Sequence, residues 1–538
     1  MQEGIQLPSC DIPECIVLKT RNLRCLQLPD TLVLVVKKWL KRAVFLLATP
    51  IVLSTVLLSA EHVRGRVALN RYFKGLRVRG EDLSSKESGS ASTQAKAAAQ
   101  ELATLEAKLT NGRIMPNSPP PRMRLTPAGN AVLCFKEESW VSDKQTNDWD
   151  QLYTDLETNA ALLNEISLLL QKPSFDNGVD LSEAPNVKFT HLAPSKQAAG
   201  WFGVEAQLAL HDHRSKDALQ ALISEVNVLK ILAEDRILIS ELVRIAIAAI
   251  ARADTWEALQ ADGWSDADLS KLEEVWEEQH FITHLDAVFR GEAVFMHVTY
   301  NKMRNSNKLA ADVLFWDETL LGLGESPEAS GWWPGIERCF KREVLCRLWR
   351  FAWLDQQELL SLKVNQRLRE IARQAAYDHS YKQVAQSAKQ LEIETQGANW
   401  YDRLRYLELE NTPGLVRSLL RSMQAETERS LAISAIAVKR FVVRHDAVPT
   451  TLSQLIPDYL AAVPLDPMDG QPIRFKSLSD GKFLLYSVGE DGIDSGGDSG
   501  LQPGKTNLRN WWQRKDVVWP APASDEEVKA YRASEWKQ

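Results

Sequence analysis

Acidic residues and glycines alternate in the segment GEDGIDSGGDSG, residues 489–500. Calcium prefers hard oxygen ligands such as carboxylates and carbonyls, and takes about six to eight of them. Glycines at 489, 492, 496 and 497 would let backbone carbonyls turn toward such an ion. The D-x-D-x-D-G pattern of an EF-hand is missing. From the residues alone, the segment is a calcium site, a catalytic loop or a solvated turn.

Two pairs of histidines have spacings at which imidazoles can share a metal. His280 and His284 stand four residues apart in a segment that we expect to be helical, a spacing used by zinc ligands. Position 281 is Phe, so the H-E-x-x-H signature of metalloproteases is absent. The alternative is two helix histidines that lie beside acidic residues. The segment HDH (211–213) offers the same choice near the end of a helix.

The composition and the missing motifs favour a binding protein over an enzyme. No G-x-S-x-G, P-loop or G-x-G-x-x-G motif is present. The net charge of −7 gives no reason to expect a nucleic-acid partner. Seventeen tryptophans in 538 residues predict sizeable buried cores. Six cysteines are too few for a disulfide scaffold in a chain of this length.

One segment is apolar enough to cross a membrane. Residues 43–60, AVFLLATPIVLSTVLLSA, contain no charge and approach the length needed to cross about 30 Å of hydrocarbon. Basic residues crowd its N-terminal side at Lys37, Lys38, Lys41 and Arg42. The positive-inside rule then places residues 1–42 in the cytoplasm and the rest of the chain outside. We expect a single-pass membrane protein with its N-terminus in the cytoplasm and most of the chain on the other side of the membrane.

A cleaved signal peptide is the alternative to an anchor. The 42 preceding residues are long for the basic region of a signal peptide, and Leu58 stands where a small residue is preferred. Both observations favour an uncleaved transmembrane helix at 43–60.

The remaining chain divides by composition and apolar spacing. Residues 61–130 predict a juxtamembrane helix followed by a linker rich in Ser, Ala and Pro. Residues 131–425 have helical apolar spacing and predict an array of helices without a named repeat. We expect two helices that turn around Asp235 and a helix that starts at Ser265. Further helices are predicted at 337–377, 381–395 and 413–445.

The predicted helix at 413–445 has Thr412 as its N-cap and Pro413 at its first position. Its packing stripe would be formed by Leu431, Ala435, Val438 and Val442. After it, Thr451 and Gln454 form a capping box. The segment PLDPMDGQP (464–472) predicts a turn.

Two strands are expected next, IRFK (473–476) and FLLYSV (483–488), which are joined at the hairpin signal Asp480-Gly481. A final strand is expected at DVVW (516–519).

The order of these elements resembles a known family. The long helix, P-T-T-L-x-x-L, Y-L-x-x-V-P-L-D-P-x-D-G-x-P, an aromatic strand and Y-S-V-G-x-D-G are similar to the globular part of the major pseudopilin of bacterial type II secretion systems. The resemblance covers roughly residues 428–500 and implies a small α+β module at 426–522, followed by a tail at 523–538. Pseudopilins also have a short basic leader and a Glu at the start of the apolar helix. Residues 43–60 contain neither, which indicates a borrowed module in a larger anchored protein.

Members of that family bind calcium in the loop after Y-S-x-G-x-D-G. The resemblance therefore implies calcium as a cofactor, with Asp491, Asp494 and Asp498 as its side-chain ligands. The segment RYFKGLRVRGEDLS (71–84) also resembles a juxtamembrane element of large bacterial membrane proteins that carry this module.

Together these features predict a mainly α protein with one N-terminal transmembrane helix, a helical array and a C-terminal pseudopilin-like α+β module. We expect a non-enzymatic binding or scaffold protein of the bacterial envelope that has an unknown protein partner and a link to secretion. The alternative is an envelope hydrolase that uses a metal held by His280 and His284.

Overall fold

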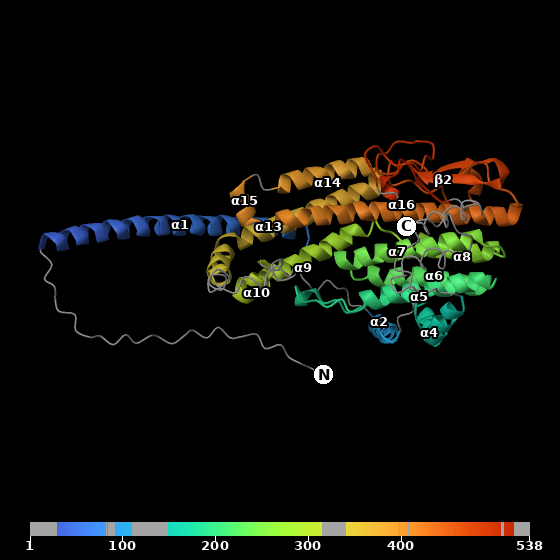
Figure 1. Cartoon of the computed structure of the whole chain (residues 1–538), viewed down its shortest axis with the longest axis horizontal. Coiled ribbons are helices and arrows are strands. Elements are labelled where there is room, and N and C mark those ends of the chain that lie inside the picture. Colours follow the sequence, from blue (N-terminus) through green and yellow to red (C-terminus); the bar gives the residue numbers. More distant parts are fainter. Residues whose placement is uncertain are drawn as a thin grey trace, which may run out of the picture. The chain divides into compact units, whose positions relative to one another are not determined.

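A computed structural model describes residues 30–81, 83, 92–109, 149–314, 340–396, 399–406, 408–506 and 510–520. These residues form a mainly helical protein with a small three-stranded sheet, as predicted (Figure 1). The chain divides into two compact units, Met1–Glu61 and His62–Gln538. Most of the predicted linker and the tail at 523–538 lie outside the described residues.

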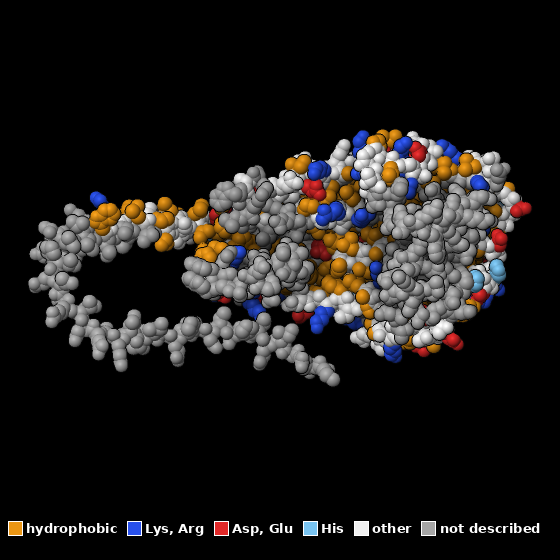
Figure 2. Space-filling view, viewed as in Figure 1, with side chains coloured by type: hydrophobic (Ala, Val, Ile, Leu, Met, Phe, Trp, Pro, Cys, Tyr) orange, Lys and Arg blue, Asp and Glu red, His pale blue; other side chains and the backbone are white. Residues whose placement is uncertain are grey.

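The described part of the first unit is helical. Helix α1 (Asp30–Val78) begins there and contains the predicted span at 43–60. Apolar side chains along it are exposed (Figure 2): Phe45, Leu46, Ile51, Val52, Leu53, Val56 and Leu57. Within the part of the chain that the structure describes, no helix combines the length and the apolar character needed to cross a membrane. The single span therefore stays a prediction.

The second unit contains the other helices. They are α2 (Thr93–Glu106), α4 (Trp149–Leu169), α5 (Leu192–His211), α6 (Ser215–Ala233), α7 (Leu238–Gln260), α8 (Asp266–Glu277), α9 (Leu285–Asn305), α10 (Asn307–Leu314), the π-helical turn η5 (Lys341–Leu345), α13 (Cys346–Asp378), α14 (Tyr381–Thr395), α15 (Trp400–Arg405) and α16 (Glu408–His445). The predicted pair around Asp235 is confirmed as α6 and α7. The helix predicted at 381–395 is confirmed as α14.

The start of α8 shows how local sequence sets a boundary. The Ser265 hydroxyl accepts from the N–H of Asp268, and the Asp268 carboxylate accepts from the N–H of Ser265. This capping box satisfies donors that the first turn of a helix leaves unpaired. The predicted start at Ser265 is confirmed, and the apolar side chains that follow at helical spacing are buried: Leu269, Leu272 and Trp276.

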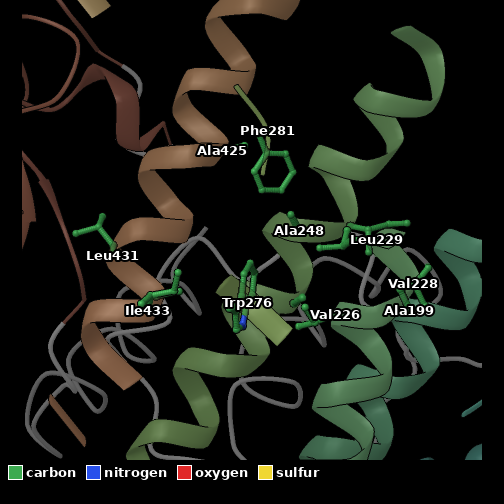
Figure 3. Packing of buried hydrophobic residues seen from close by; sticks show 14 of the residues in the cluster. Ala199, Val226, Val228, Leu229, Ala248, Trp276, Phe281, Ala425, Leu431 and Ile433 are labelled. Atoms are coloured by element: carbon green, nitrogen blue, oxygen red, sulfur yellow. The ribbon is translucent and has the colours of Figure 1, made fainter. Parts of the chain in front are cut away.

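Large aromatic side chains form the centre of the helical core. Trp276 and Phe281 are fully buried and lie between α16 and the helices α6 and α7 (Figure 3). The predicted stripe of α16 faces this core, since Leu431, Ala435 and Val438 are buried and Val442 is partly buried. Full burial of each such side chain contributes about 1.5–3 kcal/mol to the free energy of unfolding.

The predicted start of α16 is wrong by one turn. The helix begins at Glu408, so Thr412 is not its N-cap and Pro413 lies inside it. A proline this close to a helix start removes only one backbone hydrogen bond. Thr412 lies inside the helix and is completely buried.

The C-terminal residues form an antiparallel sheet in the order β1-β2-β3. Strands β1 (Arg474–Ser477) and β2 (Phe483–Ser487) form the predicted hairpin, and β3 (Val517–Val518) pairs with β2 in the predicted final strand. The predicted capping box before the sheet is wrong. Gln454 Oε1 accepts from the N–H of Thr450, while the Thr451 side chain makes no cap to the 3₁₀ turn η6 (Leu452–Leu455).

Helix α16 packs against the sheet and also against α7 and α8 (Figure 1). Two tryptophan side chains connect the helices to the C-terminal residues by hydrogen bonds. Trp256 Nε1 on α7 donates to the carbonyl of Pro520 at 2.7 Å, and Trp512 Nε1 donates to Glu428 of α16 at 3.2 Å. One continuous hydrophobic cluster extends from Ala98 to Trp519. The helices of the second unit and the C-terminal sheet therefore share a core.

Candidate functional site

The acidic loop, residues 489–500, follows β2. Gly489 and Gly497 both have left-handed backbones, with φ of 70° and 88°. A Cβ at position 489 would lie 3.1 Å from the Lys515 carbonyl oxygen, and one at position 497 would lie 2.2 Å from Leu484 Cδ2. These two glycines are therefore required for close packing of the loop, independently of any ion.

A buried carboxylate holds the loop in place. Asp516 is fully buried and accepts hydrogen bonds from the N–H groups of Ser495, Gly497 and Asp498 at 3.3, 2.7 and 2.9 Å. Burial raises the pKa of Asp516, and the three N–H groups act in the opposite direction. The sequence analysis took Asp516 only as the first residue of a strand and missed this role.

The three predicted ligands each bind their own backbone. The Oδ1 atoms of Asp491, Asp494 and Asp498 accept from the N–H two residues further along the chain, at 3.0, 2.8 and 2.8 Å. This geometry is an Asx turn, which the sequence analysis left open as the solvated-turn interpretation. The hydrogen bond from the Gly496 N–H is the main cause of the lowered pKa of Asp494.

Cationic side chains also approach two of the predicted ligands. Lys515 Nζ lies 2.7 Å from Asp498 Oδ2, and Arg474 Nε lies 3.9 Å from Asp494 Oδ2. Among the described residues, no three His, Cys, Asp or Glu side chains form a group that could hold a metal. In this geometry the three carboxylates do not converge, so a calcium ion would require the loop to rearrange.

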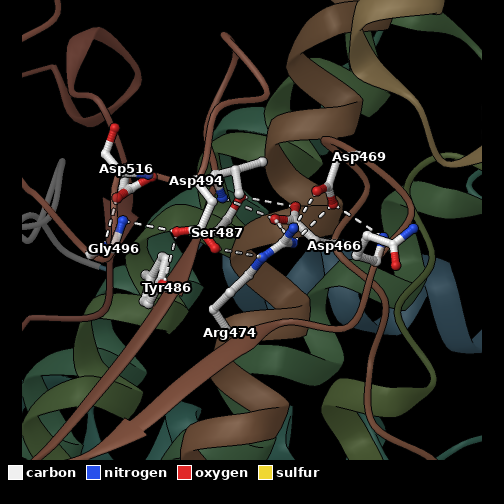
Figure 4. Close-up of polar contacts among 12 residues, drawn as sticks. Asp466, Asp469, Arg474, Tyr486, Ser487, Asp494, Gly496 and Asp516 are labelled. Carbon is white, nitrogen blue, oxygen red and sulfur yellow. Dashed lines mark hydrogen bonds and ion pairs between the residues drawn. The ribbon is translucent and has the colours of Figure 1, made fainter.

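A second buried carboxylate ties the preceding turn to the sheet. Asp466 is fully buried and accepts from the N–H groups of Met468 and Val488, both at 3.0 Å, and from the Ser487 hydroxyl at 2.8 Å. Arg474 of β1 lies 3.3 Å from it (Figure 4). The predicted turn at 464–472 is confirmed. The residue pattern of this segment did not indicate that the Asp466 carboxylate would organise it.

His280 and His284 do not share a helix, so that prediction is wrong. Helix α8 ends at Glu277 and α9 begins at Leu285, which leaves both histidines in the connection. His284 Nδ1 lies 3.0 Å from Glu241, whereas the His280 side chain is exposed. The helical spacing that would bring both imidazoles to one ion is absent.

Glu241 belongs to a buried ionic cluster. Arg244 Nη1 donates to it at 3.0 Å and also to the His280 carbonyl at 3.0 Å. Burial disfavours the charged form of Glu241, but Arg244 and His284 outweigh it and lower the pKa of Glu241. This cluster ties the 278–284 connection to α7.

The HDH segment lies at a helix end, as predicted. His211 is the last residue of α5, Asp212 is its C-cap and His213 has a left-handed backbone with φ of 59°. Asp212 pairs with Arg214 and accepts from the Tyr153 hydroxyl. The carboxylate of Asp212 is thereby engaged in stabilising the turn.

Residues 62–78 of α1 pack on α13 along a surface that we name the juxtamembrane seam, formed by residues 62–81 and 83 with α9 and α13. The His62 and Phe351 rings are stacked with centroids 4.7 Å apart, and His62 Nδ1 lies 2.7 Å from the Phe351 carbonyl. Gly65 brings the backbones together, because a Cβ there would lie 2.8 Å from Gln356 Cγ.

Further along the seam, Leu69 is buried in a small cluster with Ala293 of α9 and Leu362 of α13. The Tyr72 hydroxyl donates to Gln366 at 2.9 Å, and burial raises the pKa of Tyr72 to about 12. The contacts alternate between apolar and polar, and together they hold residues 62–81 against α9 and α13.

Charged residues close both ends of the seam. Arg66 lies 3.7 Å from Asp355 of α13, and Arg369 Nη1 lies 2.8 Å from Glu81. Hydrogen bonding to Arg369 is the main cause of the lowered pKa of Glu81.

Beneath the seam, Glu358 is fully buried and accepts from His297 Nδ1 at 2.6 Å and from Arg304. Asn301 donates to His297 Nε2 at 3.0 Å, so Nδ1 carries the proton in a neutral ring. These residues could not be found from the sequence, because Glu358 lies 61 positions from His297 and 54 from Arg304, and such separations leave no local pattern.

Comparison with known proteins adds no relative. No family model, curated protein or solved structure matches this chain.

Proposed function

We propose that this chain is a single-pass protein of the bacterial inner membrane that presents a rigid, non-enzymatic binding scaffold on the periplasmic side. In this proposal α1 crosses the bilayer at residues 43–60. The helices and the C-terminal α+β module together form the periplasmic body, which serves an unidentified protein partner and has a link to secretion.

The juxtamembrane seam is the observation that carries the proposal. A helix that only tethered a domain would need no specific contacts after the span. Here the residues from His62 to Glu81 are held by ring stacking, a glycine contact, a buried tyrosine and two ion pairs. Such contacts favour a folded body that begins directly after the span, without a flexible tether between them.

The buried polar groups support a scaffold role. Asp466, Asp516 and Glu241 each accept several hydrogen bonds from nearby backbone or side-chain donors. Carboxylates satisfied in this way stabilise one arrangement of the chain. They are typical of structural networks.

Calcium remains part of the proposal as a ligand of the acidic loop. Binding would require Asp498 to exchange Lys515 for the ion and Asp491 to turn away from its own backbone. The competition between Lys515 and calcium for Asp498 makes this prediction testable.

A topology measurement on the full chain tests the proposal. We would attach a reporter that is active only outside the cytoplasm to the C-terminus and compare wild type with the double variant Leu53→Arg, Val56→Arg. Each arginine near the centre of a span costs roughly 2.5–3.5 kcal/mol of insertion. We expect wild type to resist alkaline extraction and show reporter activity, and the double variant to lose both.

The matched control is Ile393→Arg, which places the same charge at an exposed apolar residue of α14. It should behave as wild type. Wild type that is extracted at alkaline pH, or an inactive reporter, would overturn the proposed anchor or its orientation. Co-purification with components of a secretion machine would support the link to secretion.

A further inference from the structure

An apolar stripe is exposed along η5 and the first turns of α13. It consists of Phe340, Val344, Leu345, Leu348 and Phe351, which we name the α13 stripe, and each of these residues is 41–51% exposed. Positions 340, 344, 348 and 351 recur at helical spacing and lie on one face. The opposite face is buried at Cys346 and Trp349. This segment therefore has apolar side chains on both its inner and its outer surface.

Basic residues surround the α13 stripe. Residues 340–351 contain four basic residues and one acidic residue, Glu343, which pairs with Arg347 at 2.6 Å. The part of α1 that contacts the stripe adds Arg64 and Arg66, both exposed, and no acidic residue at 62–67. The basic residues of α1 from Arg71 onward lie further along the seam, level with the middle of α13. Apolar side chains with a basic border fit the headgroup region of an anionic bilayer, where each Lys or Arg near the surface contributes about 1 kcal/mol.

The His62–Phe351 contact places the stripe close to the predicted span. His62 follows Ala60, the last residue of that span, by two positions, which is about 3 Å of helix rise. Phe351 stacks on His62 and belongs to the stripe. With residues 43–60 in the bilayer, His62 lies at the headgroup level and Phe351 lies beside it.

We propose that the α13 stripe is a second membrane contact, which inserts into the headgroup region of an anionic bilayer next to the end of α1. The inference rests on the proposed anchoring of α1. It adds that α1 and α13 enter the membrane surface together, so that the body lies against the bilayer at two points. Exposed Val63 and Val67 of α1 extend the apolar surface between them.

Lipid depth measured at single positions tests this proposal. The full chain is reconstituted into vesicles that contain phosphatidylglycerol, with an environment-sensitive fluorescent amino acid at Leu348, at Val52 or at Ile393. Val52 reports the span, and Ile393 is a comparably exposed apolar residue on α14. Brominated lipids quench only probes that reach the bilayer. We expect strong quenching at Val52, several-fold weaker but clear quenching at Leu348, and none at Ile393.

The outcomes separate the two proposals. Quenching at Val52 without quenching at Leu348 would overturn the membrane contact and leave the anchor standing. Absence of quenching at all three positions would overturn both. A blue-shifted probe at Leu348 that brominated lipids do not quench would show that a protein, such as a second copy of the chain, covers the stripe. Quenching at Ile393 as strong as at Leu348 would show unspecific adsorption and overturn the membrane contact. In vesicles without anionic lipid, quenching at Leu348 should fall while quenching at Val52 stays unchanged.

Discussion

The rings of His62 and Phe351 are stacked 4.7 Å apart at an interplanar angle of 7°, although 289 residues separate them in the chain. The substitution Phe351→Ala removes the stacking partner but keeps the carbonyl that lies next to His62. We expect faster hydrogen exchange of the amides at 62–70 and faster tryptic cleavage after Arg64 and Arg66. The exposed residue Ile393, changed to Ala, is the control and should leave both rates unchanged.

Two glycines of α1 should respond in opposite directions to alanine. A Cβ at Gly65 would lie 2.8 Å from Gln356 Cγ, whereas the only atom within 4 Å of one at Gly75 is the end of Arg79, at 4.0 Å. Alanine is favoured over glycine in a helix by about 0.8–1 kcal/mol. Gly75→Ala should therefore raise the melting temperature, and Gly65→Ala should lower it and loosen the seam. Equal shifts in the two variants would show that α1 does not pack closely on α13.

Asp516 should contribute more stability than its neighbours in the acidic loop. The substitution Asp516→Asn keeps the shape of the side chain. It removes one of the two acceptor oxygens that bind the N–H groups of Ser495, Gly497 and Asp498. We expect a loss of about 1–3 kcal/mol in the free energy of unfolding. The rate of hydrogen exchange at the amides of Gly497 and Asp498 should rise as well. The control Asp491→Asn changes an exposed Asx turn and should lower the free energy of unfolding by only about a few tenths of a kcal/mol.

The stability of the α2–α5 contact should depend on pH through Glu106. This residue is buried, its Oε2 accepts from the Ser195 hydroxyl at 3.1 Å, and Oε1 has no hydrogen-bond partner among the described residues. Burial raises the pKa of Glu106 from 4.5 to about 8. The folded chain therefore keeps a proton that the unfolded chain releases, and the free energy of unfolding falls as pH rises from about 4.5 to 8.

The variant Glu106→Gln has no such proton and should remove this part of the pH dependence. At pH 9 we expect it to be more stable than wild type, on the order of 5 kcal/mol, and at pH 4 nearly equal. Chemical denaturation at the two pH values measures the difference. Parallel pH profiles of the two proteins would show that Glu106 is ionised in the fold at neutral pH.

Calcium should stabilise the chain more strongly when Lys515 is absent. Lys515→Met removes the ammonium group that pairs with Asp498 at 2.7 Å and leaves that carboxylate available for an ion. If the acidic loop binds calcium, addition of the ion should raise the melting temperature more in Lys515→Met than in wild type, and Asp491→Ala should abolish the rise. Melting curves that are the same with calcium and with chelator in all three proteins would leave the loop as a set of Asx turns.

Local rules predicted the elements that depend on nearby residues. The cap at Ser265, the helix at 381–395 and the hairpin at 473–488 were all predicted from residues a few positions apart. The predicted start of α16 was wrong because Thr-Pro usually marks a helix start, whereas here the helix begins at Glu408 and Thr412 is buried inside it. Local preferences such as this one are often overridden by the rest of the fold.

In the candidate sites, too, features set by local spacing could be predicted from the sequence, and features set by long-range contacts could not. Asp491, Asp494 and Asp498 were found from an acidic loop, and their Asx turns follow from the same local spacing. Asp516, which lies just before β3, organises that loop from about 20 positions away, and Phe351 contacts His62 from much further along the chain. Their chemistry depends on where the fold places them, which one sequence does not reveal.

The hydrogen bond from Trp256 to the Pro520 carbonyl has a consequence for the order in which the chain is made. Residue 256 is synthesised 264 positions before its partner, and α16 lies between them in sequence. A ribosome that adds about 5–20 residues each second needs at least some 13 seconds for that distance. Helix α16 is complete only about 190 residues after Trp256, and until then the inner face of α7 lacks this partner and its apolar side chains are open to aggregation. A chain truncated before α16 would stay in that state, so residues 408–520 are the part of the chain that closes the core around α7.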